Sequence, residues 1–286
     1  MRSSPCPPAA PALRAQWLGR QLRELREGAG LTLKDASARI QREGPTLSRF
    51  EAGIYPIRLP DVTALLDLYG VVDPTRREGL IQLAAEVWQT GWWDGYSEDL
   101  PKLIIDYAWI ESRARRIYSF DLVVIPGLLQ THGYMEALIR GADTNASLTP
   151  FGARFRLDRQ RILAAPEPPD IEAVLDESLL HRAPGGPHVL REQLKHLVEL
   201  AKRPNIGVRV LPFTSHVHPS PEGTFLIFEM PEPFPEVGYV DTPAGGIYVE
   251  TERVERLIMK FDRVRDHCLD LDESAIRIRA AADAIL

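Results

Sequence analysis

Apolar residues recur at helical spacing near the start of the chain. Leu18, Leu22 and Leu25 are spaced as one face of a first helix, which we expect to end at Gly28 or Gly30, because glycine readily adopts the backbone conformation of a helix C-cap. Two shorter apolar runs follow. Too few residues separate them for anything except a tight turn, so the pattern predicts two short helices joined by a turn.

The two short helices carry local start and stop signals. Thr32 is placed to cap the first of them, with Asp35 three residues later as in a capping box. In the second, Leu47 and Phe50 are predicted to face the interior, and Gly53 is predicted to end the helix. The pattern therefore predicts a small all-helical domain.

Beyond this segment the pattern changes from purely helical to mixed. Further helices are predicted over 59–69, 76–90, 103–116, from 131, 187–202 and 252–269. Short runs rich in Val, Ile, Phe and Tyr, bounded by Pro and Gly, predict strands at 121–126, 171–178, 206–213, 223–230, 236–242 and 246–251. Because short loops join the last strands, part of the sheet is expected to be antiparallel. The fold class is α+β, and the strand order stays open.

The domain organisation follows from these elements. An N-terminal all-α helix-turn-helix domain precedes a larger domain of helices and a mixed, partly antiparallel sheet. We divide the chain into a disordered tail, a helix-turn-helix domain, a connecting helix and the larger domain, at 1–12, 13–75, 76–90 and 91–286.

Composition excludes several classes of protein. With 286 residues and 44% hydrophobic content, the chain is long enough to bury a substantial core. No stretch reaches the ~18 to 20 apolar residues of a membrane span, and the first residues lack the apolar core of a secretory signal. Cys6 and Cys268 are too few for a disulfide framework or a metal cluster. We therefore expect a cytoplasmic protein with no membrane partner.

Charge is distributed unevenly along the chain. The net charge is −6, but residues 1–60 hold ten basic and five acidic residues, a balance of +5. The remainder keeps 24 basic and 35 acidic residues, a balance of −11. A basic head on an acidic body is expected when only the head meets phosphate.

The predicted third helix carries the candidate chemistry. Opposite its buried side lies a small, polar surface with one long cation, which suits a major groove about 12 Å wide. This surface consists of Gly44, Pro45, Thr46, Ser48 and Arg49. Three short amphipathic helices also occur in proteins that never contact DNA, so packing or protein binding is the competing interpretation.

The string LGRQLRELREGAGLTLKDASARIQREGPTLSRFEAG resembles the repressor/Cro-like (Xre) helix-turn-helix domain, most closely at Leu47-Ser48-Arg49-Phe50-Glu51-x-Gly53. The resemblance implies that the first turn of the third helix reads base edges, with Gly44, Pro45, Thr46 and Arg49. It also implies phosphate contacts from Thr32, Lys34 and Arg58. Arg42 is added as a phosphate contact on its charge alone.

Two positions depart from the pattern of that family. Gln41 stands where the turn usually has glycine. Glu43 puts a negative charge at the start of the third helix, where it favours the helix dipole but faces phosphate unfavourably.

The remainder of the chain resembles a second family. From about Gly91 onward, the strings GWW, IPGLLQT, VLDESLLHR and NIGVRVLPF occur in the order and spacing of the DUF5753 domain, which follows an Xre-type head in many actinobacterial regulators. The resemblance implies a small acidic protein of the DUF397 type as a partner. Four arginines on a helix predicted to begin near Ala153 offer a docking surface, with Arg154 and Arg156 as the tentative contacts; pairing with the body's own carboxylates is the alternative. The four are Arg154, Arg156, Arg159 and Arg161.

Other candidate sites have simpler structural interpretations. His216 and His218 lie in a polar loop without a nearby third ligand. Asp176-Glu177 is either a carboxylate pair or a helix cap and salt bridge. Gly185-Gly186 lacks the lysine of a phosphate loop and is best explained as a turn. Aromatic residues Trp92, Trp93 and Tyr96 are more typical of a core than of a ligand site. We assign no catalytic residue, no cofactor and no metal.

These observations favour a DNA-binding transcriptional regulator over an enzyme, nucleoid-associated when bound to DNA. The larger domain is expected to mediate dimerisation, partner binding or signal sensing, and a homodimer is expected because one head makes few base contacts. Two alternatives stay open. One is an antitoxin-like protein that holds a small acidic partner and autoregulates. The other is a ligand-binding or enzymatic body with a vestigial head, which a deep pocket with convergent polar residues would favour.

Overall fold

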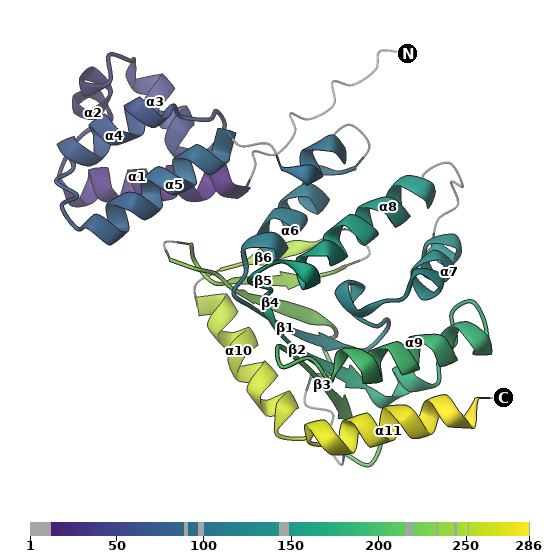
Figure 1. The fold of residues 1–286 in the computed structure, drawn as a ribbon. Coiled ribbons are helices and arrows are strands. Elements are labelled where there is room, and N and C mark those ends of the chain that lie inside the picture. The colour runs from purple at the N-terminus through teal and green to yellow at the C-terminus, as the bar shows by residue number, and fades with distance from the viewer. Residues whose placement is uncertain are drawn as a thin grey trace, which may run out of the picture. The chain divides into compact units, whose positions relative to one another are not determined.

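The computed structural model describes residues 13–88, 91–96, 100–142, 149–215, 220–232, 234–242, 245–250 and 252–285 (Figure 1). The predicted tail at 1–12 and the pair His216 and His218 lie outside these residues. The chain divides into two compact units. The first comprises Met1–Trp109 with Glu232–Phe234, and the second comprises Ile110–Pro231 with Pro235–Leu286.

Within the described residues, the regular structure of the first unit is helical. Its helices are α1 (Leu13–Gly28), α2 (Leu33–Arg39), α3 (Gly44–Glu51), α4 (Leu59–Leu68), α5 (Pro74–Trp88), the short 3-10 helix η1 (Trp92–Tyr96) and the first part of α6 (Lys102–Arg113). Leu22, Leu47 and Leu65 are completely buried, as the helical spacing of the apolar residues requires. The predicted all-α head is confirmed.

Glycines end the helices of the head where the sequence places them. Gly30, Gly53 and Gly70 follow α1, α3 and α4, with φ angles of 69°, 68° and 70°. Such angles are strained for residues with a Cβ atom.

Aromatic residues of the first unit form part of its core. Trp93 and Tyr96 are 7% and 8% exposed. The ring of Trp92 makes edge contacts with both, at centroid distances of 5.7 and 6.2 Å. These aromatic residues therefore fit a role in the core better than a role as a stacking platform for a ligand.

A six-stranded sheet forms the centre of the second unit. Its strands are β1 (Arg116–Asp121), β2 (Asp170–Asp176), β3 (Ile206–Leu211), β4 (Phe225–Glu229), β5 (Val237–Val240) and β6 (Ile247–Val249), in the order β3-β2-β1-β4-β5-β6. The pairs β1–β2 and β2–β3 are parallel, whereas the pairs β1–β4, β4–β5 and β5–β6 are antiparallel. An all-helical head followed by a mixed sheet confirms the α+β class.

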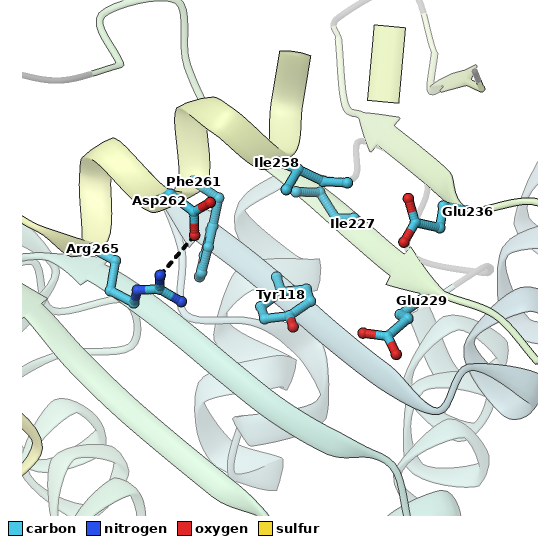
Figure 2. A pocket seen from close by; sticks show the side chains of 8 residues that line it. All are labelled: Tyr118, Ile227, Glu229, Glu236, Ile258, Phe261, Asp262 and Arg265. Carbon is cyan, nitrogen blue, oxygen red and sulfur yellow. Dashed lines mark ion pairs between the residues drawn. The ribbon is translucent and has the colours of Figure 1, made fainter. Parts of the chain in front are cut away.

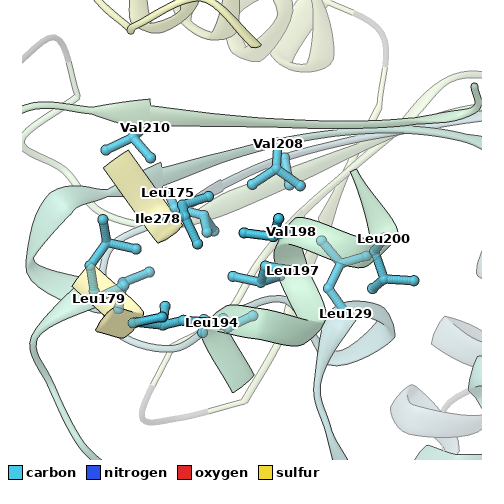
Figure 3. Close-up of a cluster of buried hydrophobic side chains, with 14 of the residues drawn as sticks. Leu129, Leu175, Leu179, Leu194, Leu197, Val198, Leu200, Val208, Val210 and Ile278 are labelled. Atoms are coloured by element: carbon cyan, nitrogen blue, oxygen red, sulfur yellow. The ribbon is translucent and has the colours of Figure 1, made fainter. Parts of the chain in front are cut away.

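Helices cover both faces of this sheet (Figure 1). They are α7 (His132–Ala142), α8 (Thr149–Gln160), α9 (Pro187–Leu200), α10 (Glu252–Arg265) and α11 (Leu271–Ala284), with the 3-10 helices η2 (Gly127–Leu129), η3 (Arg161–Ala164) and η4 (Glu177–Leu180). Leu175 and Val208 pack with Leu194 of α9 and Ile278 of α11 on one face (Figure 3). Val174, one residue from Leu175, packs with α10 on the other face.

The predicted position of the first strand was wrong. The helix expected at 103–116 ends at Arg113, and the strand occupies Arg116–Asp121 instead of 121–126. The run DLVVIP was read as the strand because it is the more apolar one. The true strand carries Ser119 and Asp121, which are buried although they are polar.

Two helix boundaries also differ from the prediction. The helix expected at 252–269 ends at Arg265, and α11 begins after Asp270, whose side chain forms a capping box with Glu273. Helix α8 begins at Thr149 rather than near Ala153.

Of the helices that the structure describes, none combines the length and the apolar character that a bilayer span requires.

Candidate nucleic-acid interface

Helix α2 begins with the predicted capping box. The hydroxyl oxygen of Thr32 accepts a hydrogen bond from the backbone N–H of Asp35 at 3.2 Å, and the backbone N–H of Thr32 donates to the Asp35 carboxylate at 3.0 Å. The Thr32 hydroxyl also donates to this carboxylate at 2.6 Å, and hydrogen bonds from Thr32 lower the pKa of Asp35. The side chain of Thr32 therefore serves the helix, and a phosphate would compete with Asp35 for its hydroxyl proton.

A tight turn joins α2 to α3. Gln41 has a φ angle of 54°, and among the described residues it is the one with a side chain and a positive φ. The N–H of the next residue, Arg42, donates to the carbonyl of Ser37 at 2.9 Å. The glycine that Gln41 replaces in the resembled pattern would adopt this conformation without strain.

Helix α3 has one buried side and one exposed side. Leu47 is completely buried, and α3 contacts both α1 and α2. Phe50, predicted to be buried, is only half-buried. Glu43 occupies the N-cap position but makes no capping hydrogen bond with its side chain.

The base-reading candidates all lie on this helix. Pro45 and Arg49 are exposed, whereas Gly44 and Thr46 are half-exposed. One turn of helix thus presents small side chains and, one turn further, a long cation.

Close packing against α1 fixes the position of α3. A Cβ atom on Gly19 of α1 would lie 2.5 Å from the carbonyl oxygens of Phe50 and Glu51. A Cβ atom on Gly53 would lie 2.7 Å from the backbone of Gln16. Both positions need glycine, because only glycine permits this approach of the two backbones.

A buried ion pair links the ends of the same two helices. The guanidinium of Arg26 donates to both carboxylate oxygens of Glu51, at 2.7 and 3.0 Å, and to the carbonyl of Leu31 at 2.9 Å. The two side chains are 9% and 5% exposed, and the bond to Glu51 is the main cause that raises the pKa of Arg26. Glu51 belongs to the motif that carries the resemblance, but the sequence did not reveal its partner.

The phosphate candidates differ in what already engages them. Lys34 and Arg58 are exposed, and Arg58 occupies the N-cap position of α4. Arg42 lies 3.6 Å from the Asp61 carboxylate, a contact that phosphate would have to replace or share. Helix α2 contacts both α3 and α4, so the helices next to these candidates belong to one packed group.

One exposed aromatic residue next to α3 was missed by the sequence reasoning. The guanidinium carbon of Arg49 lies 5.9 Å from the ring centre of Tyr55. The available signal was an aromatic residue placed just after the glycine that ends α3.

In the second unit, the four arginines of the tentative docking surface differ in exposure and in their partners. Arg159 makes two hydrogen bonds of 2.7 Å to the buried Glu111, and Arg161 pairs with Asp158 at 2.9 Å. Arg156 is half-buried, and burial lowers its pKa. Arg154 is exposed. Internal pairing thus accounts for two of the four.

The remaining polar candidates have structural roles. Asp176 caps η4 by accepting from the N–H of Ser178 at 2.9 Å. Glu177 accepts from the N–H of Phe213 at 2.6 Å and from the guanidinium of Arg277.

The glycine pair before α9 forms a turn. Gly185 and Gly186 have φ angles of 75° and 98°. Among the residues that the structure describes, no three His, Cys, Asp or Glu side chains gather as metal ligands.

A small hollow between α10 and the sheet tests the ligand-binding alternative (Figure 2). Its volume is about 100 Å³, and Tyr118, Ile227 and Phe261 provide its apolar walls. Glu229 and Glu236 lie at one end, while Arg265 pairs with Asp262 at the other at 2.8 Å. Pockets for drug-sized ligands usually measure about 300 to 1,000 Å³, so this hollow is smaller than such a pocket. A more open hollow of about 250 Å³ lies elsewhere on the second unit and is lined by Arg116, Glu172 and Arg209 among others.

Comparison with known proteins places both units. A helix-turn-helix domain model matches residues 17–80, and the model of the domain of unknown function DUF5753 matches residues 104–280, more than half of the chain. Searches among curated proteins and solved structures gave no match. The helix-turn-helix match supports a DNA-binding regulator. The chain belongs to the DUF5753 family and carries a helix-turn-helix domain in front of the family's domain.

Proposed function

We propose that the chain is a sequence-specific transcriptional regulator that reads base edges with the exposed side of α3. Gly44, Pro45 and Thr46 let the start of the helix approach the floor of the major groove, and Arg49 supplies the hydrogen-bond donors. The observation that carries this proposal is the orientation of α3. The helix packs against α1 on one side, while Pro45 and Arg49 on its other side are exposed and Gly44 and Thr46 are half-exposed.

We assign phosphate binding to residues around the reading helix. Lys34 and Arg58 are exposed cations at the starts of α2 and α4. Thr32 and Arg42 complete the set, although Asp35 and Asp61 already engage them. Lys34 and Arg58 are therefore expected to contribute most of the salt-dependent affinity.

Binding titrations with two DNA duplexes test these assignments. One duplex is enriched from a random library by the full chain, and the other is its scrambled version. Arg49→Ala should weaken binding to the enriched duplex by roughly 1 to 3 kcal/mol and leave the scrambled duplex almost unaffected. Lys34→Ala and Arg58→Ala should weaken both and flatten the salt dependence. Equal losses on both duplexes for Arg49→Ala would reassign this residue to phosphate.

We further propose that the chain binds its operator as a homodimer through the DUF5753 domain. A single helix-turn-helix head contacts few bases, and such domains usually read two half-sites about one helical turn apart. Sedimentation of the full chain at micromolar concentration should show a dimer, and the enriched operator should have inverted symmetry. A monomer together with an asymmetric operator would contradict this proposal.

Partner binding is the remaining proposal for the second unit. A small acidic protein of the DUF397 type would meet a body that is itself acidic, so it needs a locally basic contact. Arg154 is the exposed member of the tentative pair, whereas Arg156 is half-buried. Arg154 is therefore expected to make the larger contribution to partner binding. On co-expression with such a protein, Arg154→Glu should abolish co-purification. Arg161→Glu is the matched control on the adjoining η3, and retention of the partner by Arg154→Glu would reject the surface.

A further inference from the structure

The chain path after α3 is fixed by two hydrogen bonds. The N–H of Gly53 donates to the carbonyl of Phe50, and the N–H of Ile54 donates to the carbonyl of Arg49, both at 2.9 Å. This pair of bonds is a Schellman motif, with Gly53 in the left-handed conformation. The packing of Gly53 against α1 leaves no room for another residue there. The residue that follows the motif, Tyr55, therefore has a defined place beside α3.

That place puts the Tyr55 ring next to the candidate base-reading cation. The guanidinium carbon of Arg49 lies 5.9 Å from the ring centre, within the range of a cation–π contact. Tyr55 is 51% exposed, so burial in the core does not explain the position of its ring. The adjacent Ile54 is 55% exposed and provides a natural comparison.

An exposed arginine loses much rotamer freedom when it binds a base. A contact that already restricts the side chain in the free protein reduces this loss on binding. Exposed cation–π contacts contribute about 0.5 to 1 kcal/mol, which corresponds to a factor of about two to five in affinity. We propose that Tyr55 is a positioning residue, which holds the guanidinium of Arg49 ready for a base edge and thereby sets part of the operator specificity. This inference rests on the proposed function.

Affinity measurements on the full chain test the role of the ring. Tyr55→Ala should weaken binding to the enriched duplex about two- to fivefold and leave binding to the scrambled duplex and the salt dependence unchanged. Tyr55→Phe keeps the ring face and should restore wild-type affinity. In an Arg49→Ala background, Tyr55→Ala should have no further effect, because the side chain that it positions is gone.

Other outcomes would overturn the proposal. A loss for Tyr55→Phe on both duplexes would show that the hydroxyl binds phosphate. A loss of the same size for Ile54→Ala would show that any apolar side chain in this loop matters. Additive losses in the double variant would show that Tyr55 acts independently of Arg49.

A measurement without DNA separates this inference from the proposed function. The ring current of Tyr55 should shift the Nε–H resonance of Arg49 in the NMR spectrum of the free chain. Tyr55→Ala should remove the shift and Tyr55→Phe should keep it. An Arg49 resonance that ignores Tyr55→Ala overturns the pairing even if the chain binds its operator. A shift together with equal affinity for both duplexes would refute sequence-specific reading, and with it the role of this pair.

Discussion

In the turn between α2 and α3, Gln41 adopts a left-handed backbone conformation that residues with a Cβ atom rarely adopt. Its φ angle of 54° costs a residue with a Cβ atom about 1 kcal/mol or more. Glycine would avoid this strain, although its greater freedom in the unfolded chain offsets part of the gain.

Gln41→Gly and Gln41→Ala form a matched pair that isolates this strain. Both remove the same polar side chain, but only glycine relieves the backbone. We expect the free energy of unfolding of the head to be higher for Gln41→Gly than for Gln41→Ala by up to about 1 kcal/mol, which is the relieved strain less the entropy that glycine loses on folding. Thermal unfolding followed by circular dichroism measures the difference. A Gln41→Gly variant that is less stable than Gln41→Ala would show that the turn carries no strain at this position, because only the entropy of glycine in the unfolded chain would then separate the two.

Asp121 is a buried carboxylate of the second unit. It ends β1 with a side chain almost completely shielded from solvent, and one carboxylate oxygen has no hydrogen-bond partner among the described residues. Burial raises the pKa of Asp121 from 3.8 to about 7, while Ser119 on the same strand acts in the opposite direction. The folded chain therefore holds this proton at pH values where the unfolded chain has released it.

The second unit should therefore lose stability as the pH rises from about 4 to about 7. Below this window both states are protonated, and above it both are ionised, so the loss is complete above the folded-state pKa. Asp121→Asn should remove the slope and raise the free energy of unfolding at pH 8 by a few kcal/mol, as an order of magnitude. Urea unfolding at pH 5 and pH 8 measures both effects. Asp266→Asn, at an exposed position, is the control, and an unchanged slope in Asp121→Asn would refute the assignment.

At the scale of elements, the Arg26–Glu51 pair connects the end of α1 to the end of the reading helix. Its geometry is bidentate and it is nearly excluded from solvent. Removing one partner of such a pair leaves an uncompensated buried charge. The pair thus makes the position of α3 depend on α1.

Glu51→Ala should destabilise the head by about 3 to 5 kcal/mol, because Arg26 stays buried without its partner. Glu27→Ala is the matched control: Glu27 also contacts Arg26, at 3.2 Å, but its side chain is 52% exposed, so its loss should destabilise the head far less than the loss of Glu51. The free energy of unfolding of the head, measured by chemical denaturation, gives the effect of both variants. Similar effects for the two would contradict a special role for the buried pair.

Elements with local signals were predictable from the sequence. The Thr32–Asp35 box and the glycines at 53 and 70 mark helix ends through their own backbone preferences, and the structure has those ends. The predicted position of β1 was wrong because this strand is defined by its pairing with β2 and β4. Its polar residues Ser119 and Asp121 are buried in the sheet, so the local pattern does not reveal it. The end of α10 was missed because the amphipathic pattern continues across the Asp270 cap.

The candidate site was predictable to a similar, partial extent. The exposed residues of α3 follow from helical periodicity, and the structure exposes Arg49 as expected. The contacts that hold α3 were not predictable. Arg26 and Glu51 are 25 positions apart, and the approach of Gly19 to α3 depends on how two helices pack.

At the scale of the molecule, charge separates the two parts of the chain. The first 60 residues have a balance of +5 and the rest has −11. An acidic body repels the phosphate backbone, so electrostatic attraction is confined to the head. Such a chain needs specific base contacts to bind DNA tightly at physiological salt, because few cations are available for non-specific binding.

The specificity ratio of the full chain tests this account most directly. It is the affinity for the enriched duplex divided by the affinity for its scrambled version, measured at 150 mM salt, a value near physiological ionic strength. A sequence-specific regulator should give a ratio of about a thousand or more. A ratio near one, with a folded and soluble chain, would contradict the claim that α3 reads DNA sequence.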